Sequence, residues 1–547
     1  MTNIKNINSN DRKTWLQAID KGLAGELKQS LFLYEKLLSK HSRNLSLNYE
    51  ASLLYIKESR YQDAYNCMER IFEKFQNNIN YLNDFSVVCT KLSFLEKAEY
   101  LSKKAFEKDS KNLNHLINLG AIYNLMGNFE KALEVIDHAI QINPMEPHYY
   151  NLMGVTLVKS GMDLVAEKMF QIAVALDENF IEAKLNLAVL VSKQGDYLRS
   201  IELFEDIIRK INFHNFYSVS INHIKYLLSY DYLSVGRLKE GWLNYDLGFD
   251  LNIQPSSRRN PTRTFTRPGW GGENSKGKVI LIWREQGIGD EILFYTCLPD
   301  LEKTCLSIIV ECEERLVGVL SRSFPKFQIR KENFSLLNSK DHVLEDYDYH
   351  LPVGSLMRYF RNDISKFNST LPIFKIDENL AEYHEQNLKI KNAIKKRIGI
   401  CWRSGLLDME RNKNYLVIED LIPILKDKNY NFINLQYGDC EDEILTVEKS
   451  LDIDIIRWNT LDLKNDIDSV LALISRLDLV ITVSTAVSSM TASIGKQQLL
   501  IDARGWCNLG TNHYPFFPTI ECIFPPENRI LSECIPRVHS RLNEIFK

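Results

Sequence analysis

The residues whose types and spacing could do chemistry form a short turn near the middle of the chain. An apolar run, Val279 to Trp283, precedes Gly287-Ile288-Gly289-Asp290, and apolar residues at helical spacing follow. This order predicts a strand, a glycine turn and a helix. Glycine lets the backbone approach a ligand closely, and the first N–H groups of the helix are free to bind an anion. A nicotinamide enzyme is disfavoured, because its fingerprint needs a third glycine near position 292, where this chain has Ile292.

Asp290 is the ionisable group that this turn presents. Aspartate is a frequent N-cap of helices, so a purely structural role is one interpretation. The other is a general base, placed to take a proton from the hydroxyl of an acceptor. The residues of the turn leave both interpretations open.

Alternating strands and helices are predicted around this turn, and the alternation indicates parallel sheets with helices on both faces. A break near residues 365–395 divides the region into two Rossmann-like domains, 277–380 and 381–547, which would bind ligands at the carboxyl ends of their strands. The predicted strands are 279–283, 307–312, 397–402, 431–435, 453–456, 478–483 and 497–501, and the predicted helices include 290–300, 418–427, 467–476 and 486–494.

The N-terminal region, residues 11–250, repeats every 34 residues. Each repeat is predicted to form two amphipathic helices, with small residues where the helices cross and a turn residue between them. Repeats begin near residues 11, 45, 79, 113, 147 and 181, and an irregular seventh pair spans 215–250. The small positions are Ala64, Ala98, Ala132, Ala166 and Ser200, then Ala105, Ala139 and Ala173; the turn positions are Gly25, Ser59, Ser93, Gly127, Gly161 and Gly195. Stacked pairs of this kind form an α-solenoid, whose concave groove commonly binds a peptide or protein.

Residues 251–276, "LNIQPSSRRNPTRTFTRPGWGGENSK", are rich in Pro, Gly, Ser and Arg and predict a linker packed along a surface. Its arginines are predicted to be solvated, and contact with an anionic ligand or partner is the alternative.

Composition limits the classes of function. A formal net charge of −4 disfavours binding to nucleic acid or to an anionic membrane surface. The ten cysteines include no CxxC pair and no Cys/His cluster at ligand spacing, which predicts reduced thiols and no metal site. The N-terminus lacks the apolar core of a signal peptide, and no apolar run reaches membrane-spanning length. We therefore expect a soluble cytoplasmic protein without a membrane span.

The repeats resemble the tetratricopeptide repeat (TPR), whose consensus positions are filled in the best copy by Leu119, Gly120, Tyr123, Ala132, Ala139 and Pro144. The protein O-GlcNAc transferases, a related arrangement, line their groove with a ladder of asparagines. The comparable column here is Leu16, Glu50, Asp84, Asn118, Leu152 and Asn186. Because this column is no ladder, that mode of acceptor binding is not expected.

Five further motifs, in order, resemble the heptosyltransferase-like glycosyltransferases, which are related to the ADP-heptose:lipopolysaccharide heptosyltransferases, in a bacterial branch fused to TPRs. They are "REQGIGDEILFYTCLP" (284–299), "YDYHLPVGSLMRYF" (347–360), "RIGICWRSG" (397–405), "NLQYGD" (434–439) and "LDLVITVSTAVSSMTASIGK" (477–496). The resemblance implies the GT-B fold of two Rossmann-like domains, with the acceptor on the first and the nucleotide sugar on the second. It also implies inverting transfer without a metal or other cofactor.

The same resemblance assigns roles to individual residues. It makes Asp290 the catalytic base, with Glu285 in reserve, and it makes Lys413 the contact to phosphate, with Arg403 and Arg411 nearby. Without a metal, cations and a helix N-terminus must stabilise the departing diphosphate. The expected donor-binding residues are Gly287, Gly289, Arg403, Arg411, Lys413, Gln436, Ser484, Thr485, Ser488 and Ser489.

One departure from the family pattern bears on the donor. The lipopolysaccharide enzymes carry Asp-Thr-x-x-x-His where this chain has Ser484-Thr485 and, four residues later, Ser489. The acid of that motif helps to hold the sugar, so specificity for heptose does not carry over. Either the donor is another sugar or the site has decayed.

The sequence leaves three alternative functions open. The first is a glycosyltransferase that modifies a protein, such as flagellin or another surface protein, captured by the TPR array. The second is transfer to a saccharide or lipopolysaccharide. The third is a non-catalytic TPR scaffold with a degenerate transferase domain.

Overall fold

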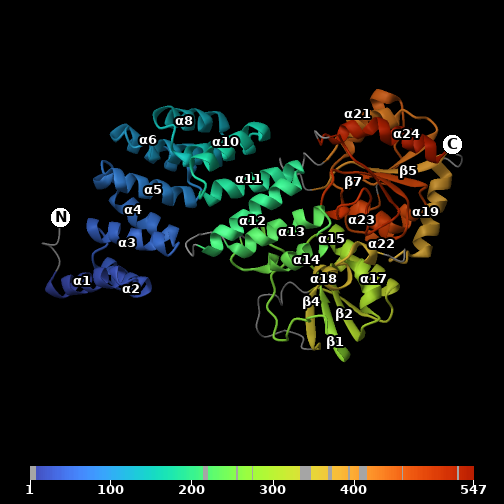
Figure 1. Cartoon of the computed structure of the whole chain (residues 1–547), viewed down its shortest axis with the longest axis horizontal. Helices are drawn as coiled ribbons and strands as arrows, with labels where there is room; N and C mark the ends of the chain where they lie inside the picture. Colours follow the sequence, from blue (N-terminus) through green and yellow to red (C-terminus); the bar gives the residue numbers. More distant parts are fainter. Residues whose placement is uncertain are drawn as a thin grey trace. The chain divides into compact units, whose positions relative to one another are not determined.

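The computed structural model describes residues 8–213, 220–253, 257–273, 275–332, 346–367, 372–391, 395–405, 415–458, 460–526 and 529–547. The chain forms two compact units, Met1–Leu190 and Val191–Lys547 (Figure 1).

The first unit consists of helix pairs that follow one another along the chain, and successive helices among the first ten pack against each other (Figure 1). The helices begin near the predicted starts of the repeats. They are α1 (Ser9–Leu23), α2 (Leu27–Lys40), α3 (Leu45–Lys57), α4 (Tyr61–Phe75), α5 (Ile79–Lys91), α6 (Leu95–Lys108), α7 (Asn114–Leu125), α8 (Phe129–Ile142), α9 (Pro147–Lys159), α10 (Asp163–Leu176) and α11 (Ile181–Gln194).

The predicted small and turn positions have the environments that the repeat requires. All eight small residues are fully buried, so the helices of a pair approach closely there. All six turn residues have positive φ, including the serines Ser59 (φ 59°) and Ser93 (φ 61°). A left-handed residue after the first helix lets the chain turn back at once into the second. The TPR-like helical repeat predicted from the 34-residue period is confirmed.

The second unit begins before the predicted linker, because three more helices pack with the α/β region. These are α12 (Tyr197–Phe213), α13 (Ile221–Ser234) and α14 (Leu238–Tyr245). Trp242 of α14 is buried and donates its indole N–H to the carbonyl of Arg361, 2.9 Å away. Tyr230 of α13 packs edge-on against Trp506, with ring centroids 6.2 Å apart. The irregular seventh pair is therefore part of the core of the second unit.

The first sheet has four parallel strands in the order β3-β2-β1-β4. One face packs in a continuous core with α15 (Ile288–Phe294) and α17 (Val317–Ser323). The strands are β1 (Ser275–Trp283), β2 (Cys305–Cys312), β3 (Gln328–Lys331) and β4 (Tyr349–Pro352). The last two were not predicted, because polar residues interrupt both of them and leave no apolar run.

The second sheet has five parallel strands in the order β6-β5-β7-β8-β9. Helices α21 (Glu441–Leu451) and α24 (Ile535–Ile545) cover one face, while α22 (Ile467–Ser475) and α23 (Ala486–Ser493) cover the other (Figure 1). The strands are β5 (Lys396–Cys401), β6 (Tyr430–Asn434), β7 (Leu479–Val483), β8 (Gln498–Ile501) and β9 (Ile520–Ile523). Parallel sheets with helices on both faces make this region an α/β structure.

Three predicted elements differ from the structure, and one of them, the helix 418–427, is divided into a 3₁₀ turn (Ile418–Leu421) and α20 (Ile422–Leu425). Residues 453–456 form no strand, because only Ile456 bridges to the sheet, opposite Ile433. The predicted helix 290–300 is divided into α15, a 3₁₀ turn (Tyr295–Cys297) and α16 (Leu298–Leu301), where a proline occupies the first turn. Proline suits a new helix start and interrupts a continuing helix, because it has no N–H to donate.

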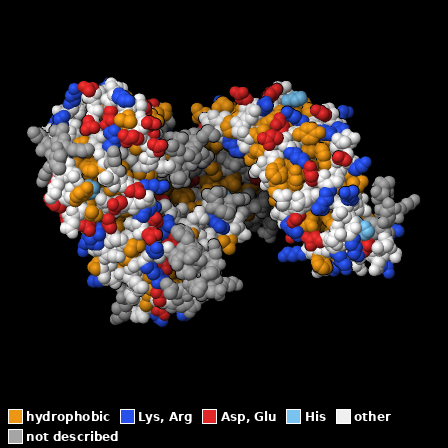
Figure 2. Space-filling model, turned by 180° about the vertical axis from the view of Figure 1, so that it is seen from behind, with side chains coloured by type: hydrophobic (Ala, Val, Ile, Leu, Met, Phe, Trp, Pro, Cys, Tyr) orange, Lys and Arg blue, Asp and Glu red, His pale blue; other side chains and the backbone are white. Residues whose placement is uncertain are grey.

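Charged side chains of both signs are interspersed over the face shown in Figure 2. The nine described cysteines form no disulfide. Among the described helices, none combines the length and the apolar character needed to cross a membrane.

Candidate active site

The carboxyl ends of the two sheets are the places where open parallel sheets bind ligands, at the point where strand order reverses. In the first sheet this point lies between β1 and β4. The turn Arg284–Gly287 leaves β1 there and leads into α15, and residues 353–355 leave β4 beside it. Glu285 and Asp290 belong to these connections.

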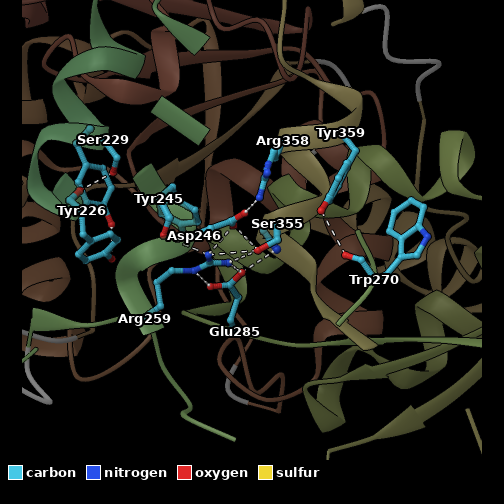
Figure 3. Close-up of polar contacts among 12 residues, drawn as sticks. Tyr226, Ser229, Tyr245, Asp246, Arg259, Trp270, Glu285, Ser355, Arg358 and Tyr359 are labelled. Carbon is cyan, nitrogen blue, oxygen red and sulfur yellow. Dashed lines mark hydrogen bonds and ion pairs between the residues drawn. The ribbon is translucent and has the colours of Figure 1, made fainter. Parts of the chain in front are cut away.

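Glu285 lies in a buried ion pair with Arg259 (Figure 3). Neither side chain is exposed, and Arg259 Nε donates to Glu285 Oε2 at 2.5 Å. The backbone N–H of Gly354 donates to Glu285 Oε1 at 2.7 Å. Arg259 also contacts Asp246 and Ser355, each at 3.3 Å. Both oxygens of Glu285 are therefore occupied, and this placement favours a positioning role over the reserve base.

The prediction that the linker arginines are solvated is wrong for Arg259 and Arg263. Arg259 is fully buried between the rings of Tyr245 and Phe249, with its guanidinium carbon 4.1 and 4.2 Å from the ring centroids. Arg263 pairs with Glu311 at 2.7 Å. A buried arginine needs a carboxylate partner, and those partners lie on elements far away in sequence, where a local charge pattern cannot show them.

Asp290 is the third residue of α15 and remains partly exposed. Burial raises the pKa of its carboxyl to about 6; a hydrogen bond from the Gly287 backbone opposes the rise, and the negative charge of Glu285 adds to it. Gly287, not Asp290, is the N-cap of α15. A carboxylate with a pKa close to neutral accepts protons better than an ordinary one and still ionises at pH 7.

The second sheet reverses its strand order between β5 and β7. β7 leads through Ser484 and Thr485 into α23, and Thr485 is the N-cap of that helix but makes no side-chain hydrogen bond to it. Its hydroxyl lies 3.8 Å from the thiol of Cys401, at the end of β5. The first N–H groups of α23 are thus left without a side-chain cap, as in helices whose N-terminus receives phosphate.

Helices α15 and α23 pack against each other, so the structure brings the two predicted parts of the site together. A methyl group on Gly289 would lie 3.5 Å from the hydroxyl of Ser489 and 3.6 Å from Cα of Ala486. These are ordinary van der Waals distances, so the Asp290 turn lies directly against the start of α23. Among the predicted residues, Gly287, Gly289, Asp290, Ser484, Thr485 and Ser489 lie around this contact.

A cavity of about 290 Å³ opens at the end of β6, on the same edge of the second sheet. Its lining includes two aromatic rings (Tyr437 and Trp458) and three carboxylates (Asp439, Glu441 and Asp462). Rings are the type of side chain on which a planar base stacks, and carboxylates accept hydrogen bonds from sugar hydroxyls. The lining residues are Asn434, Gln436, Tyr437, Gly438, Asp439, Cys440, Glu441, Arg457, Trp458, Leu461, Asp462, Leu463 and Lys464.

Gln436 connects this cavity with the end of β5. Its Oε1 accepts the backbone N–H groups of Trp402 (3.1 Å) and Arg403 (2.9 Å), while its Nε2 donates to the carbonyl of Tyr437. Arg403 is buried, and its guanidinium binds Glu443 and the carbonyl of Asp439. Both residues order the wall of the cavity.

The remaining predicted residues have other positions. Ser488 is buried inside α23, and its carbonyl accepts from Gln498 at 2.9 Å. Arg411 and Lys413 lie outside the described residues.

Sequence reasoning missed Asp502, which follows β8. Burial raises the pKa of its carboxyl to about 7, and the neighbouring Ser484 side chain opposes the rise. A signal was available: "LLIDARGW" ends an apolar strand with an acidic residue, as expected at the carboxyl edge of a sheet. No group of three or more His, Cys, Asp or Glu side chains in the described ranges is arranged to hold a metal ion.

One protein family model and one curated protein match this chain over part of its length. The family model of the coatomer epsilon subunit matches residues 52–145, which include whole helices α4–α8. Protein FlbA of Caulobacter vibrioides is 27% identical over 429 residues, covering 76% of this chain and 70% of FlbA. That match is longer than either compact unit, so the similarity extends into both.

Among solved structures, a tetratricopeptide repeat protein from Parabacteroides merdae is 14% identical, covers 46% of this chain and 96% of its own, and has a TM-score of 0.40. The MamA protein is 17% identical, covers 31% and 94%, and has a TM-score of 0.29.

Proposed function

We propose that this protein is a glycosyltransferase of the GT-B type, which moves a sugar from a nucleotide-sugar donor to a hydroxyl of an acceptor. The observation that carries the proposal is the contact between the Asp290 turn and the uncapped start of α23. A carboxylate of raised pKa and an anion-binding helix end meet there, at the reversal points of two parallel sheets.

The donor lies along the carboxyl edge of the second sheet. Its base and ribose occupy the cavity after β6, and its diphosphate crosses the ends of β5 and β7 to the N-terminus of α23. Adjacent strands are about 4.8 Å apart, so two strand steps cover about 10 Å, the reach needed between a nucleoside and its second phosphate. The free N–H groups of α23 and the Thr485 hydroxyl donate to the phosphate oxygens. No metal or other cofactor is part of the proposed reaction.

Asp290 acts as the general base. Its carboxylate takes the proton of the acceptor hydroxyl while the hydroxyl oxygen forms a bond to the anomeric carbon of the sugar. The bond from that carbon to the phosphate oxygen breaks on the opposite side, and its electron pair leaves with the nucleotide. Direct displacement of this kind inverts the anomeric centre.

The acceptor is a protein captured by the repeat array, such as flagellin or another surface protein. Support comes from the TPR-like fold of the first unit, since stacked repeats offer an extended groove for a polypeptide. Two carboxylates of the predicted groove column are held in place by aromatic donors. Glu50 accepts from Trp15 (2.6 Å) and Tyr34 (2.8 Å), and Asp84 accepts from Tyr49 (2.8 Å). Fixed acceptors of this kind suit the N–H groups of a bound chain.

Thermal unfolding with UDP, GDP, ADP, dTDP, CMP and their common sugar conjugates tests the donor site. A compound at about a hundred times its dissociation constant adds about 2.7 kcal/mol of stability. We expect one nucleotide family to shift the midpoint, and Thr485→Val to reduce that shift.

The matched control is Thr446→Val on α21, whose hydroxyl donates only to the carbonyl of Asp442. No shift with any compound would contradict the proposal and favour a TPR scaffold with a degenerate transferase domain.

A further inference from the structure

Strand β8, which pairs with β7, is followed directly by the carboxylate of Asp502. In the parallel pair of β7 and β8, Val483 lies opposite Ile501. The next residues along the two strands, Ser484 and Asp502, are therefore neighbours at the carboxyl edge of the sheet. Burial raises the pKa of the Asp502 carboxyl to about 7, and the neighbouring Ser484 side chain and Ala503 backbone oppose the rise.

Asp502 continues the series of groups along this edge. The cavity lies at the end of β6, the free helix end follows β7, and Asp502 follows β8, the next strand in the sheet. A nucleotide sugar with its base in the cavity and its diphosphate at α23 would place its sugar one further strand along, about 4.8 Å beyond the phosphate. Asp502 is the ionisable side chain at that position, and it remains partly exposed.

Asp502 is also on the same side of the site as the proposed base. Burial raises the pKa of the Cys507 thiol well above its ordinary value, and the negative charges of both Asp502 and Asp290 raise it further. The charges of both carboxylates therefore act on the same thiol, although 212 positions separate the two aspartates in the sequence. The sugar of the donor must lie between the phosphate site and Asp290, and Asp502 borders that space.

We infer that Asp502 binds hydroxyl groups of the donor sugar and so determines which sugar is accepted. The inference rests on the proposed function, because it concerns the same donor. A carboxylate offers two oxygens and accepts hydrogen bonds from neighbouring hydroxyls of the transferred sugar, which the free nucleotide lacks beyond its phosphates.

Titration calorimetry on the full chain tests the inference with five pairs of compounds: UDP and UDP-glucose, GDP and GDP-mannose, ADP and ADP-glucose, dTDP and dTDP-glucose, and CMP and CMP-N-acetylneuraminate. The wild type should bind at least one conjugate more tightly than its nucleotide. Asp502→Asn should weaken binding of that conjugate about ten- to hundredfold, because the sugar hydroxyl loses a hydrogen bond to a charged carboxylate. The affinity for the nucleotide should stay unchanged, because the nucleotide has no such sugar.

The control variant is Glu521→Gln on β9, the strand next to β8, which removes the same charge from a partly exposed ion pair with Arg541 of α24. It should change neither affinity. A second variant, Ser484→Asp combined with Asp502→Ser, moves the carboxylate to the adjacent strand and should restore part of the lost affinity, which a merely structural role would not do. It also keeps the test informative if Asp502→Asn does not fold.

The outcomes separate the two claims. Equal affinity of the wild type and Asp502→Asn for every conjugate, with conjugates preferred over nucleotides, would overturn the role of Asp502 alone. Absence of binding of all ten compounds by the wild type would overturn the proposed function and the inference with it.

Discussion

The two compact units bury polar groups in different ways. In the first unit, buried hydroxyls satisfy backbone carbonyls or one another: Ser30 donates to Ala18 at 2.6 Å, and Ser86 and Ser102 are 2.7 Å apart. In the second unit, buried ionised groups gather near the carboxyl ends of the strands, with Glu285 against Arg259 as the clearest case.

The difference matches the division of roles in the proposed function. Buried hydroxyls cost little and hold neighbouring helices in register. Buried charges are costly unless they are paired, and their pKa values shift, which is the usual condition of groups that transfer protons or bind charged ligands. The proposed function therefore assigns packing and recognition to the repeats, and reaction to the α/β region.

Within the second unit, the largest expected effect comes from Asp290→Asn. General bases typically contribute about 10²- to 10⁴-fold to rate, so transfer should fall by that factor while the affinity for the nucleotide sugar stays nearly constant. The measurement is the steady-state rate of sugar transfer with donor and acceptor varied. The control is Asp63→Asn, which changes the third residue of α4, as Asp290 is the third residue of α15. A full rate in Asp290→Asn would refute the base.

Next in size is the effect of Glu285→Gln on folding. Removing one partner of a buried ion pair leaves Arg259 uncompensated and costs about 3–5 kcal/mol. Denaturant unfolding should show this loss in the transition that reports on the second unit. Glu521→Gln, which breaks an exposed pair with Arg541, should cost no more than about 1 kcal/mol. Similar small losses in both variants would mean that the Arg259 network is not the anchor of the Asp290 turn.

Gly154→Ala tests how the packing of two repeat helices contributes to the stability of the first unit. The added methyl would lie 2.5 Å from the ring of Phe170, which is almost fully buried between α9 and α10. Overpacking of this kind costs about 1–3 kcal/mol. Circular dichroism should show a lower midpoint for the helical transition, with nucleotide binding unchanged. Leu164→Ala, at a position that is 76% exposed, is the control and should have little effect. Loss of nucleotide binding in Gly154→Ala would contradict the separation of roles.

The pH dependence of the rate should be the mildest effect. Because burial raises the pKa of Asp290 to about 6, the base is protonated below that pH. The value of kcat/KM should therefore rise with pH through about 6 and fall about tenfold for each unit below it. An ordinary aspartate, with a pKa of 3.8, would keep its full rate at pH 5. A rate that is level down to pH 5 would argue against this environment for the base.

Sequence reasoning was most successful where a pattern repeats or persists. The 34-residue period located the helix pairs, because each small and turn residue must meet the same local packing in every repeat. Apolar runs located β1, β2, β5, β6, β7 and β8. The short strands β3, β4 and β9 were not found, because polar residues interrupt each of them and leave no apolar run.

For the candidate site, the sequence located the residues that lie in motifs beside strands, and it did not locate the groups that surround them. Residues in motifs next to long strands, such as Asp290 and Thr485, lie where the motifs implied. The partners that set their environment come from elsewhere in the chain: Arg259 lies in a segment that resembled a linker, and Asp502 lies outside the quoted motifs. Only the packed structure brings these groups together.

Hydrogen exchange of the full chain, with and without each of the five nucleotide sugars, tests most directly the claim that the α/β region holds the donor. The account predicts that at least one compound slows exchange in backbone amides of residues 434–441 and 484–490, with no change in helices α1–α10. Slower exchange confined to the repeat helices, or no change with any of the compounds, would contradict it.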